Sequence, residues 1–299
     1  MTRNAYLILA HECSMVLETL LSVLDDERND IYLHVDGKVP NVFHRLEGRK
    51  LNRATLYLLP RPIKVYWGHT SQVEAELLLM EMALAHGSYV YYHLLSDSDL
   101  PVKSQDEIHR FFSENAGKEF IGFWNDEGHR RDALRKIRYY YLFNRWKKRS
   151  SSRWIHVLTT PLRNLILGAQ KVVGVNRQHD RKTEIKKGFN WFSITEECCR
   201  FVLSQREYIR NEFRYTLCPD EFFLQTVVWN SPFREHLYDA DDAQLGSMRA
   251  IDWQRGSPYI WHAEDVDYLL HSPYLFARKF ASSEMAAVKD ISLRIKMLV

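Results

Sequence analysis

Short apolar runs alternate with segments of helical spacing over the first 125 residues, and this alternation restricts the chain to few folds. Residues 5–10, 31–35 and 89–95 have the length and composition of buried strands, and residues 15–24 carry apolar side chains at helical spacing. Strands separated by helices in this way usually pair in parallel and bury both faces of their sheet. The sequence therefore predicts an α/β fold with a mainly parallel central sheet and helices on both faces.

The same patterns predict the remaining elements. Further strands are expected at residues 63–67, 119–124, 190–194, 249–253 and 259–262, and further helices at residues 71–85, 104–115, 196–203 and 265–270. Ser71, with Glu74 three residues later, has the spacing of a helix N-cap, and Thr195 is a second N-cap candidate. Pro219 suits the first turn of a helix, which would place the two acids that follow it at the positive end of the helix dipole.

The bulk composition is that of a globular protein without a membrane-spanning segment. The 299 residues are 45% hydrophobic and 26% charged, and no apolar run approaches the roughly 18 residues that a membrane-spanning helix needs. The first apolar run lacks the cleavage site of a signal peptide. The four cysteines show no metal-binding spacing and are expected to be reduced thiols. We therefore expect a cytoplasmic protein.

Positive charge is concentrated in one segment. Residues 129–187 contain 17 Lys and Arg against three acids, a net charge of +14, whereas the rest of the chain carries −11. Such a segment favours an anionic partner. Within it, residues 154–175 place apolar side chains near helical spacing, although Pro161 is expected to break or kink the helix. This stretch either docks on an anionic membrane surface or packs on the core with a solvated basic face.

Polar and aromatic residues follow the predicted strands. His11, Asp36, Trp67, Asp97 and Asp99 all stand at strand ends. Ligands of parallel α/β folds bind at the carboxyl ends of the strands, so these side chains mark a candidate site. The sequence contains no glycine-rich phosphate loop, no GxSxG motif and no HExxH motif, which argues against several common nucleotide-binding and hydrolytic enzymes.

Short motifs follow these elements in a fixed order. They are Ala10-His11, His34-Val35-Asp36, residues 67–74, Asp99-Leu100-Pro101, residues 191–194, Pro219-Asp220-Glu221 and residues 275–280. In this order and spacing, they resemble the core-2/I-branching β-1,6-N-acetylglucosaminyltransferases and the related peptide O-xylosyltransferases. The matching segments run from Tyr6 to Phe280, and the match is poor in the middle.

The resemblance implies a GT-A-type α/β fold and an enzyme that inverts the anomeric centre of a UDP-sugar without a metal ion or other cofactor. It implies a single catalytic domain over residues 1–299, with a basic, partly amphipathic insertion at about 129–187. N-acetylglucosamine is the expected sugar, and a glycan or a lipid-linked glycan is the expected acceptor. Because the animal members carry an anchor and disulfides that this sequence lacks, we expect a microbial, cytoplasmic relative, which the basic segment would hold at the inner membrane face.

The resemblance also implies roles for individual residues. Glu221 matches the glutamate that acts as general base. Lys279 matches a lysine that neutralises the diphosphate, and Arg255 lies one position away from the partner arginine. Asp36 matches the aspartate that contacts the nucleoside, and His11 lines the same pocket by its position.

Elementary chemistry agrees with these roles. A general base takes the proton of the attacking hydroxyl, and cationic groups stabilise the departing diphosphate. The resemblance further implies that Asp99 and Trp253 contact the acceptor. Without the resemblance, Glu221 would be interpreted as a first-turn acid that complements the helix dipole, Asp36 as a turn residue and Trp253 as a core tryptophan.

Two other functions remain as alternatives. Asp97-Ser98-Asp99 has the Asp-x-Asp form with which metal-dependent GT-A enzymes hold a divalent cation, and paired carboxylates attract such ions. The basic segment, with its interleaved tyrosine and tryptophan, has features of a nucleic-acid-binding surface. Because the rest of the chain is acidic and contains no known nucleic-acid-binding motif, we expect no nucleic acid partner.

Overall fold

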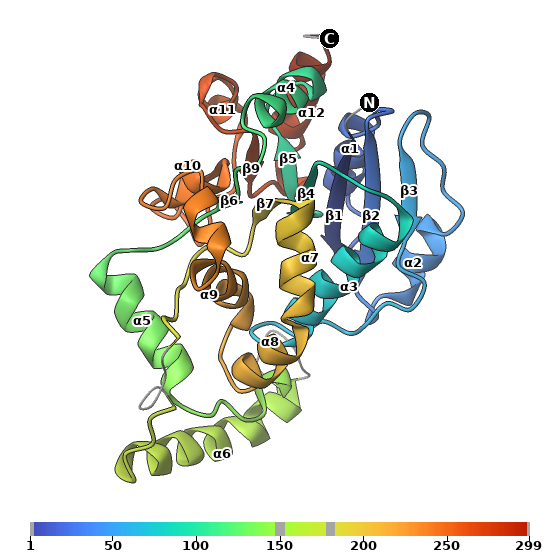
Figure 1. Cartoon of the computed structure of the whole chain (residues 1–299). Helices are drawn as coiled ribbons and strands as arrows, with labels where there is room; N and C mark the ends of the chain where they lie inside the picture. The colour runs from blue at the N-terminus through green and yellow to red at the C-terminus, as the bar shows by residue number, and fades with distance from the viewer. Residues whose placement is uncertain (1–2, 147–152, 178–182, 298–299) are drawn as a thin grey trace.

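The computed structural model describes residues 3–146, 153–177 and 183–297, and its centre is a six-stranded sheet (Figure 1). The strand order is β3-β2-β1-β4-β7-β6. Strands β1 to β4 run parallel, β7 pairs antiparallel with β4, and β6 pairs antiparallel with β7 and so runs in the direction of β1 to β4. The bounds are β1 (Asn4–Ala10), β2 (Asn29–Val35), β3 (Thr55–Leu58), β4 (Tyr91–Ser96), β6 (Phe120–Ile121) and β7 (Phe192–Thr195).

Helices cover both faces of this sheet, as the sequence predicts. The side chains of Tyr6 and Ile8 on β1 point to one core, which they share with α1 (Met15–Val23) and α12 (Met285–Met297). Leu7, between them, points to a second core with α3 (Ser71–His86) and α7 (Glu196–Ser204). Alternation along a strand sends neighbouring side chains to opposite faces, so β1, β2 and β4 are buried along all or nearly all of their length, whereas the edge strand β3 is partly exposed. The predicted mainly parallel α/β fold is confirmed.

A small second sheet joins the C-terminal third to the end of β4. It has the order β5-β9-β8, with β5 (Asp99–Pro101), β9 (Phe276–Arg278) and β8 (Arg249–Ile251). Asp99 pairs with Arg278 in the register of β5 and β9. Segments that are nearly 180 residues apart in the sequence therefore meet where the central strands end.

The remaining helices are distributed around the two sheets. They are α2 (Pro40–Leu46), α4 (Gln105–Glu114), α5 (Glu127–Arg138), α6 (Arg153–Val172), α8 (Arg206–Phe213), α9 (Phe223–Trp229), α10 (Ala243–Ser247) and α11 (Val266–His271). Short 3-10 turns lie at η1 (Asn144–Trp146), η2 (Pro219–Glu221), η3 (Pro232–His236), η4 (Ala263–Asp265) and η5 (Ser282–Glu284).

The helix caps only partly follow the expectation. Thr195 is the N-cap of α7, and its side chain accepts a hydrogen bond from the backbone N–H of Cys198, as predicted. The expectation for Ser71 is wrong, because α3 begins at Ser71 and Thr70 occupies the cap position. The Ser71 hydroxyl instead accepts a hydrogen bond from the backbone N–H of Tyr66 and so holds the preceding loop.

The expectation of strands at residues 63–67 and 259–262 is also wrong. The third parallel strand is β3, and residues 63–67 form an irregular segment beside the end of β2. There, the backbone N–H groups of Ile63 and Val65 donate to the side chains of His34 and Asp36 instead of to a neighbouring strand. Two prolines just before Ile63 remove backbone donors that a strand would use.

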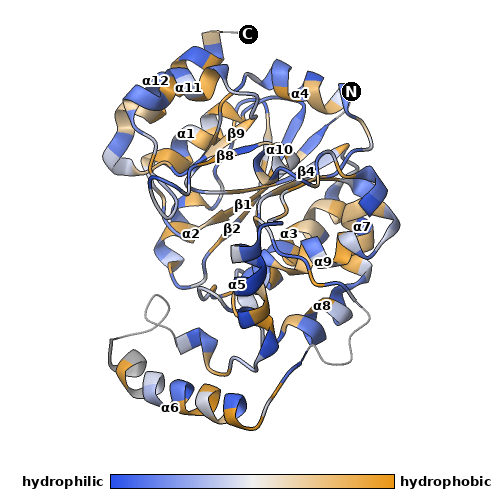
Figure 2. Cartoon of the chain, turned by 90° about the vertical axis from the view of Figure 1, so that its left-hand side faces the viewer, coloured by the Kyte–Doolittle hydropathy of each residue, from blue (hydrophilic) through white to orange (hydrophobic). Residues whose placement is uncertain are grey.

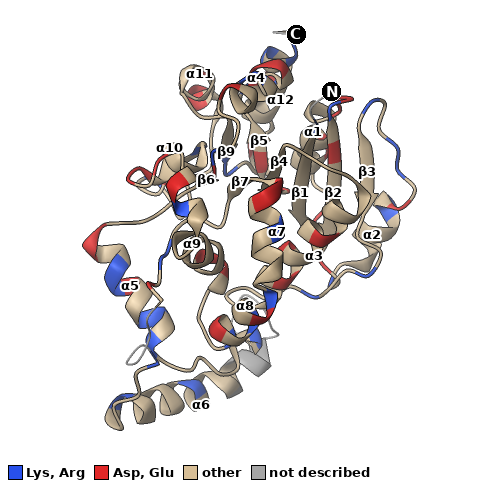
Figure 3. Ribbon diagram, in the orientation of Figure 1, with Lys and Arg blue, Asp and Glu red and all other residues tan. Residues whose placement is uncertain are grey.

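The basic segment forms α5, η1 and α6, which lie at the end of the molecule below the sheet in Figure 1. Lys and Arg residues lie along α5 and α6 (Figure 3). Contrary to the expectation of a break, α6 continues through Pro161. In the part of the chain that the structure describes, no helix combines the length and apolar character that crossing a membrane requires.

Candidate active site

A cavity of about 330 Å³ opens where β1, β2 and β4 end. Three of the predicted donor-binding residues, His11, Asp36 and Lys279, line it together. Trp67 lines it as well, from the loop before α3, and Trp191 lies at another part of its wall. The position agrees with the rule that ligands of parallel sheets bind at the carboxyl ends of the strands.

Asp36 is fixed at the end of β2. One carboxylate oxygen accepts the backbone N–H groups of Lys38 and Val65, at 2.9 and 3.2 Å, and the other lies 3.1 Å from the Lys38 ammonium. Asp36 is only 7% exposed, yet it lines the cavity. The carboxylate therefore holds the turn and also presents an acceptor to a ligand.

His11 is paired with Asp97 at the mouth of the cavity. The Asp97 carboxylate accepts the backbone N–H groups of His11 and Glu12 and lies 2.7 Å from the His11 ring nitrogen Nδ1. The hydrogen bond to Asp97 raises the pKa of His11, although partial burial and the charge of Lys279 oppose the shift. His11 and Lys279 therefore lie close enough to interact electrostatically at this edge of the cavity.

Arg278 adds a cation that the sequence analysis did not identify. Its guanidinium lies 4.0 Å over the ring of Trp191 and 3.4 Å from the carboxylate of Asp99, and it lines the cavity next to Lys279. Burial lowers the pKa of Arg278, and the charges of Asp99 and Asp97 oppose that shift. In the sequence, the only indication of this second cation was that Arg278 directly precedes Lys279.

Asp99 lies behind Arg278 and does not line this cavity. The residue is 3% exposed, and its carboxylate accepts the backbone N–H of Ser96 at 2.6 Å. The predicted contact of Asp99 with an acceptor does not follow from this position. From this position the Asp99 carboxylate can hold the Arg278 guanidinium in its orientation.

Arg255 and Trp253 lie in a neighbouring cavity of about 470 Å³. The Arg255 guanidinium pairs with Asp252 and Asp265, at 2.5 and 2.8 Å, and lies 3.9 Å over the ring of Tyr259. The backbone N–H of Lys279 donates to the Tyr259 carbonyl, so the two predicted cations are linked through one residue. The structure does not, however, bring Arg255 into the cavity that holds Asp36 and Lys279.

Trp253 belongs to an exposed aromatic cluster. Its ring is 46% exposed and lies 6.3 Å from the ring of Phe189 and 6.2 Å from that of Trp124. An exposed indole on an aromatic base is a suitable surface for the apolar face of a sugar. The expectation of a buried core tryptophan does not hold.

Glu221 ends the 3-10 turn η2 and is held by two lysines of the basic segment. Its carboxylate lies 2.6 Å from the ammonium of Lys136 on α5 and 3.2 Å from that of Lys187. Both ammonium groups also contact Asp132, at 3.0 and 2.7 Å. Burial alone would lower the pKa of Lys136, but the charges of Glu221 and Cys218 and the hydrogen bonds to Glu221 and Asp132 together more than offset it, so the pKa rises. The segment predicted as an insertion thus contributes to the surroundings of the predicted base.

Glu221 does not line the donor cavity, but its turn is hydrogen-bonded to two of the segments that do. The backbone N–H of Gly188 donates to the Glu221 carbonyl, and Trp191, three residues later, is part of the cavity wall. On another side, the backbone N–H of Cys218 donates to the carbonyl of Gly68, which follows Trp67 of the cavity. Two short backbone connections therefore link the predicted base to the predicted donor site.

The Asp-x-Asp motif is engaged in contacts within the chain. Asp97 and Asp99 are 2% and 3% exposed, and each carboxylate already accepts backbone N–H groups. Among the described residues, no three or more His, Cys, Asp and Glu side chains are grouped so that they could hold a metal ion.

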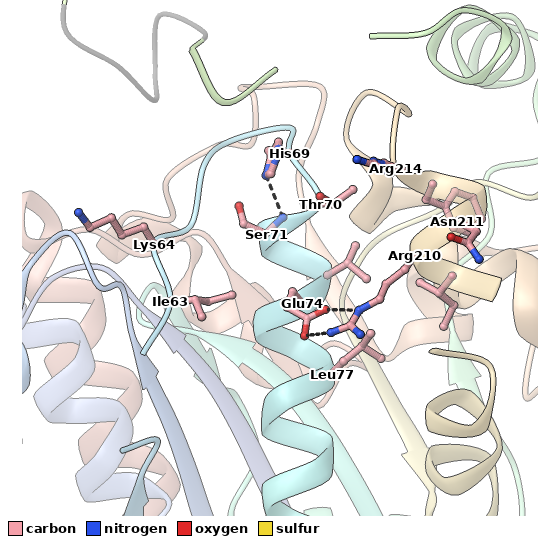
Figure 4. A pocket seen from close by; sticks show the side chains of 13 residues that line it. Ile63, Lys64, His69, Thr70, Ser71, Glu74, Leu77, Arg210, Asn211 and Arg214 are labelled. Carbon is pink, nitrogen blue, oxygen red and sulfur yellow. Dashed lines mark hydrogen bonds and ion pairs between the residues drawn. The ribbon is translucent and has the colours of Figure 1, made fainter. Parts of the chain in front are cut away.

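A further cavity of about 460 Å³ lies beside the N-terminus of α3 (Figure 4). Residues 63–71 contribute to it, and Figure 4 shows Glu74 bound to Arg210 across it, with Lys64, His69 and Arg214 around its opening. The sequence analysis did not single out this cavity. The loop before α3 therefore contributes to two neighbouring cavities, because Val65 and Trp67 line the donor cavity.

Comparisons with known proteins place the chain in a family. Residues 4–269 match the model of the family described as Core-2/I-Branching enzyme. Xylosyltransferase 2 of Canis lupus familiaris is 27% identical and that of Rattus norvegicus 25% identical, each over 97% of this chain and 33% of the relative. The chain thus spans about a third of the length of these relatives. A solved structure of mouse xyloside xylosyltransferase 1 aligns over 93% of this chain and 97% of its own, with 10% identity and a TM-score of 0.38, which is too low to add to the assignment. On the family match, the chain belongs to the Core-2/I-Branching enzyme family.

Proposed function

We propose that the protein is an inverting glycosyltransferase that moves a sugar from a UDP-sugar to a hydroxyl of a glycan acceptor without a metal ion. The observation that carries the proposal is the convergence of Asp36, His11, Arg278 and Lys279 on one cavity, with Glu221 beside it. A carboxylate acceptor and a set of cations suit a nucleoside diphosphate.

The reaction needs one proton acceptor and a stabilised leaving group. The acceptor hydroxyl attacks C1 of the sugar, Glu221 takes its proton, and the bond between C1 and the diphosphate breaks. Lys279 and Arg278 would neutralise the charge that develops on the diphosphate. Lys136 and Lys187 hold the Glu221 carboxylate in place through two ion pairs.

Two sugars are the leading donors. The resemblance to branching enzymes favours N-acetylglucosamine, whereas the relatives are named xylosyltransferases. A thermal-shift and hydrolysis panel with UDP-N-acetylglucosamine, UDP-xylose and UDP-glucose separates these donors without knowledge of the acceptor. Selective hydrolysis of one UDP-sugar identifies the donor.

We expect UDP to stabilise the fold. A ligand at a hundred times its Kd adds about 2.7 kcal/mol to the free energy of unfolding. The Asp36→Ala variant should lose most of this gain, whereas Asp267→Ala, which changes an exposed aspartate on α11, should keep it. Calorimetry and thermal unfolding with UDP give the measurement. The absence of any UDP or UDP-sugar binding at millimolar concentration would remove the basis of the proposal.

The affinity for UDP is expected to fall as the pH rises through the pKa of His11. The hydrogen bond to Asp97 raises the pKa of His11, so the imidazole stays protonated to a higher pH than an ordinary histidine. The cation attracts the diphosphate below that pKa, and this attraction is lost above it. Titration calorimetry from pH 5.5 to 8.5 on the wild type and on His11→Gln checks this, because the variant keeps the titration of the phosphate itself. Parallel pH profiles of the two proteins would show that His11 does not contact the diphosphate.

A further inference from the structure

Helix α6 turns its apolar side toward solvent. Val157, Leu165 and Val172 are 55%, 69% and 87% exposed. At 100° per residue they lie on one side of the helix together with Leu162, which is 45% exposed. Neither hydrophobic core of the protein includes a described side chain of α6. Figure 2 shows α6 at the margin of the molecule, away from the central sheet, with hydrophobic residues along its length.

The opposite side of α6 is attached by polar contacts. The Gln170 side chain accepts the backbone N–H of Tyr140 at 2.8 Å and donates to the Tyr140 carbonyl at 3.1 Å. The Thr159 hydroxyl donates to the Trp146 carbonyl at 3.4 Å. A helix on the surface of a globular protein normally buries its apolar side and exposes its polar side. In α6 several large apolar side chains are exposed instead, so this apolar side is available to another partner.

The charges around α6 have a single sign. Residues 133–179 contain 11 Lys and Arg and no Asp or Glu. Among those that the structure describes, Arg135, Arg138, Arg145 and Lys171 are exposed. A solvated protein surface usually mixes both signs. An exposed apolar helix side that is flanked in the sequence by cations is typical of helices that lie in the interface of an anionic membrane.

We propose that α6 docks on an anionic lipid bilayer, with its apolar side in the boundary between headgroups and acyl chains and its cations on the headgroups. A nucleic acid would bind the cations but leave the apolar side in water. A second copy of the chain would bring two segments of the same charge together. The helix lies in the plane of the bilayer, because it lacks the apolar character to cross it.

Docking would bring the candidate active site close to the lipid surface, a step that rests on the proposed function. The basic segment contacts that site at two points. Lys136 on α5 binds Glu221, and the Arg145 guanidinium of η1 lies 5.4 Å from the ring centre of Tyr66, next to Trp67 of the donor cavity. A docked α6 would therefore orient the site toward acceptors held in the membrane.

Flotation with vesicles tests the docking independently of enzymatic activity. The protein should float with phosphatidylglycerol-containing vesicles and not with pure phosphatidylcholine vesicles, and added salt should weaken the recovery. The double change Leu165→Asp and Val172→Asp should lower the partition coefficient by about tenfold or more, because charged groups resist burial among acyl chains. Lys171→Glu should also lower it.

Matched controls lie on α12. Leu293→Asp changes a residue that is 61% exposed, and Lys289→Glu reverses an exposed lysine, so both should float as the wild type does. Thermal unfolding checks that each variant is folded.

Equal recovery of the wild type with neutral and anionic vesicles would overturn the proposal, and so would full recovery of the double aspartate variant. Binding of a single-stranded RNA without vesicle binding would assign the segment to nucleic acid instead. Because UDP binding is measured separately, failure of docking would not be mistaken for failure of the proposed function.

Discussion

Replacing Glu221 by glutamine is expected to lower turnover by about 10²–10⁴-fold and to leave the affinity for UDP close to that of the wild type. Glutamine keeps the shape of the side chain and loses the ability to take the proton of the acceptor hydroxyl. Glu221 does not line the donor cavity, so donor binding should not depend on its charge. Steady-state kinetics with the identified donor give the turnover, and titration calorimetry gives the Kd for UDP.

Two variants make this test specific. Glu184→Gln removes another carboxylate of the basic segment, one that is 59% exposed and paired with Lys186, and it should behave as the wild type does. Asp220→Asn changes the neighbouring acid, whose pKa is raised by burial and by the charge of Glu221. Turnover at the wild-type level in Glu221→Gln, together with a large loss in Asp220→Asn, would transfer the role of base to Asp220.

The elements that the sequence predicted best are those in which local pattern and burial agree. Strands β1 and β2 are buried along almost their whole length and lie between other strands, and α1 combines a serine N-cap with a buried apolar side. Residues 63–67 look like a strand by the same criterion. Their backbone is satisfied by the side chains of His34 and Asp36, which no local pattern reveals, because the contacts span about 29 residues.

The residues of the candidate site also fall into those that the sequence predicts and those that it does not. Position after a strand was enough to bring His11 and Asp36 together, because parallel strands end at one edge of a sheet. The partners of Glu221 could not be predicted, because Lys136 and Lys187 reach it from segments that are 85 and 34 positions away in the sequence. Arg278 was overlooked for a different reason. Its charge is buried under Trp191, and the sequence alone gives no indication of whether an arginine beside a lysine faces solvent or a cavity.

Lys279→Ala is expected to lower turnover by about 10²–10³-fold, the range found when one preorganised group that stabilises transition-state charge is removed. The diphosphate gains charge as the bond to the sugar breaks, and Lys279 lines the cavity beside Arg278. Lys289→Ala, at an exposed lysine of α12, is the control and should have no effect. The Arg255→Ala variant tests whether Arg255 leaves Asp252 and Asp265 to bind the donor. If it does, the loss of turnover in this variant should approach that in Lys279→Ala.

The same assay separates the two means of stabilising the leaving group. A divalent cation held by Asp97 and Asp99 and a cation pair at Arg278 and Lys279 would repel each other, so one of them should dominate. The Asp97 carboxylate already binds His11 and Glu12, and Asp99 is buried against Arg278. We therefore expect activity to persist in excess EDTA, and Asp97→Asn to retain far more activity than Lys279→Ala. Activity that disappears in EDTA and returns with Mn²⁺ would instead make Asp97 and Asp99 the metal ligands, because only bound metal, and not the lysine, is removed by a chelator.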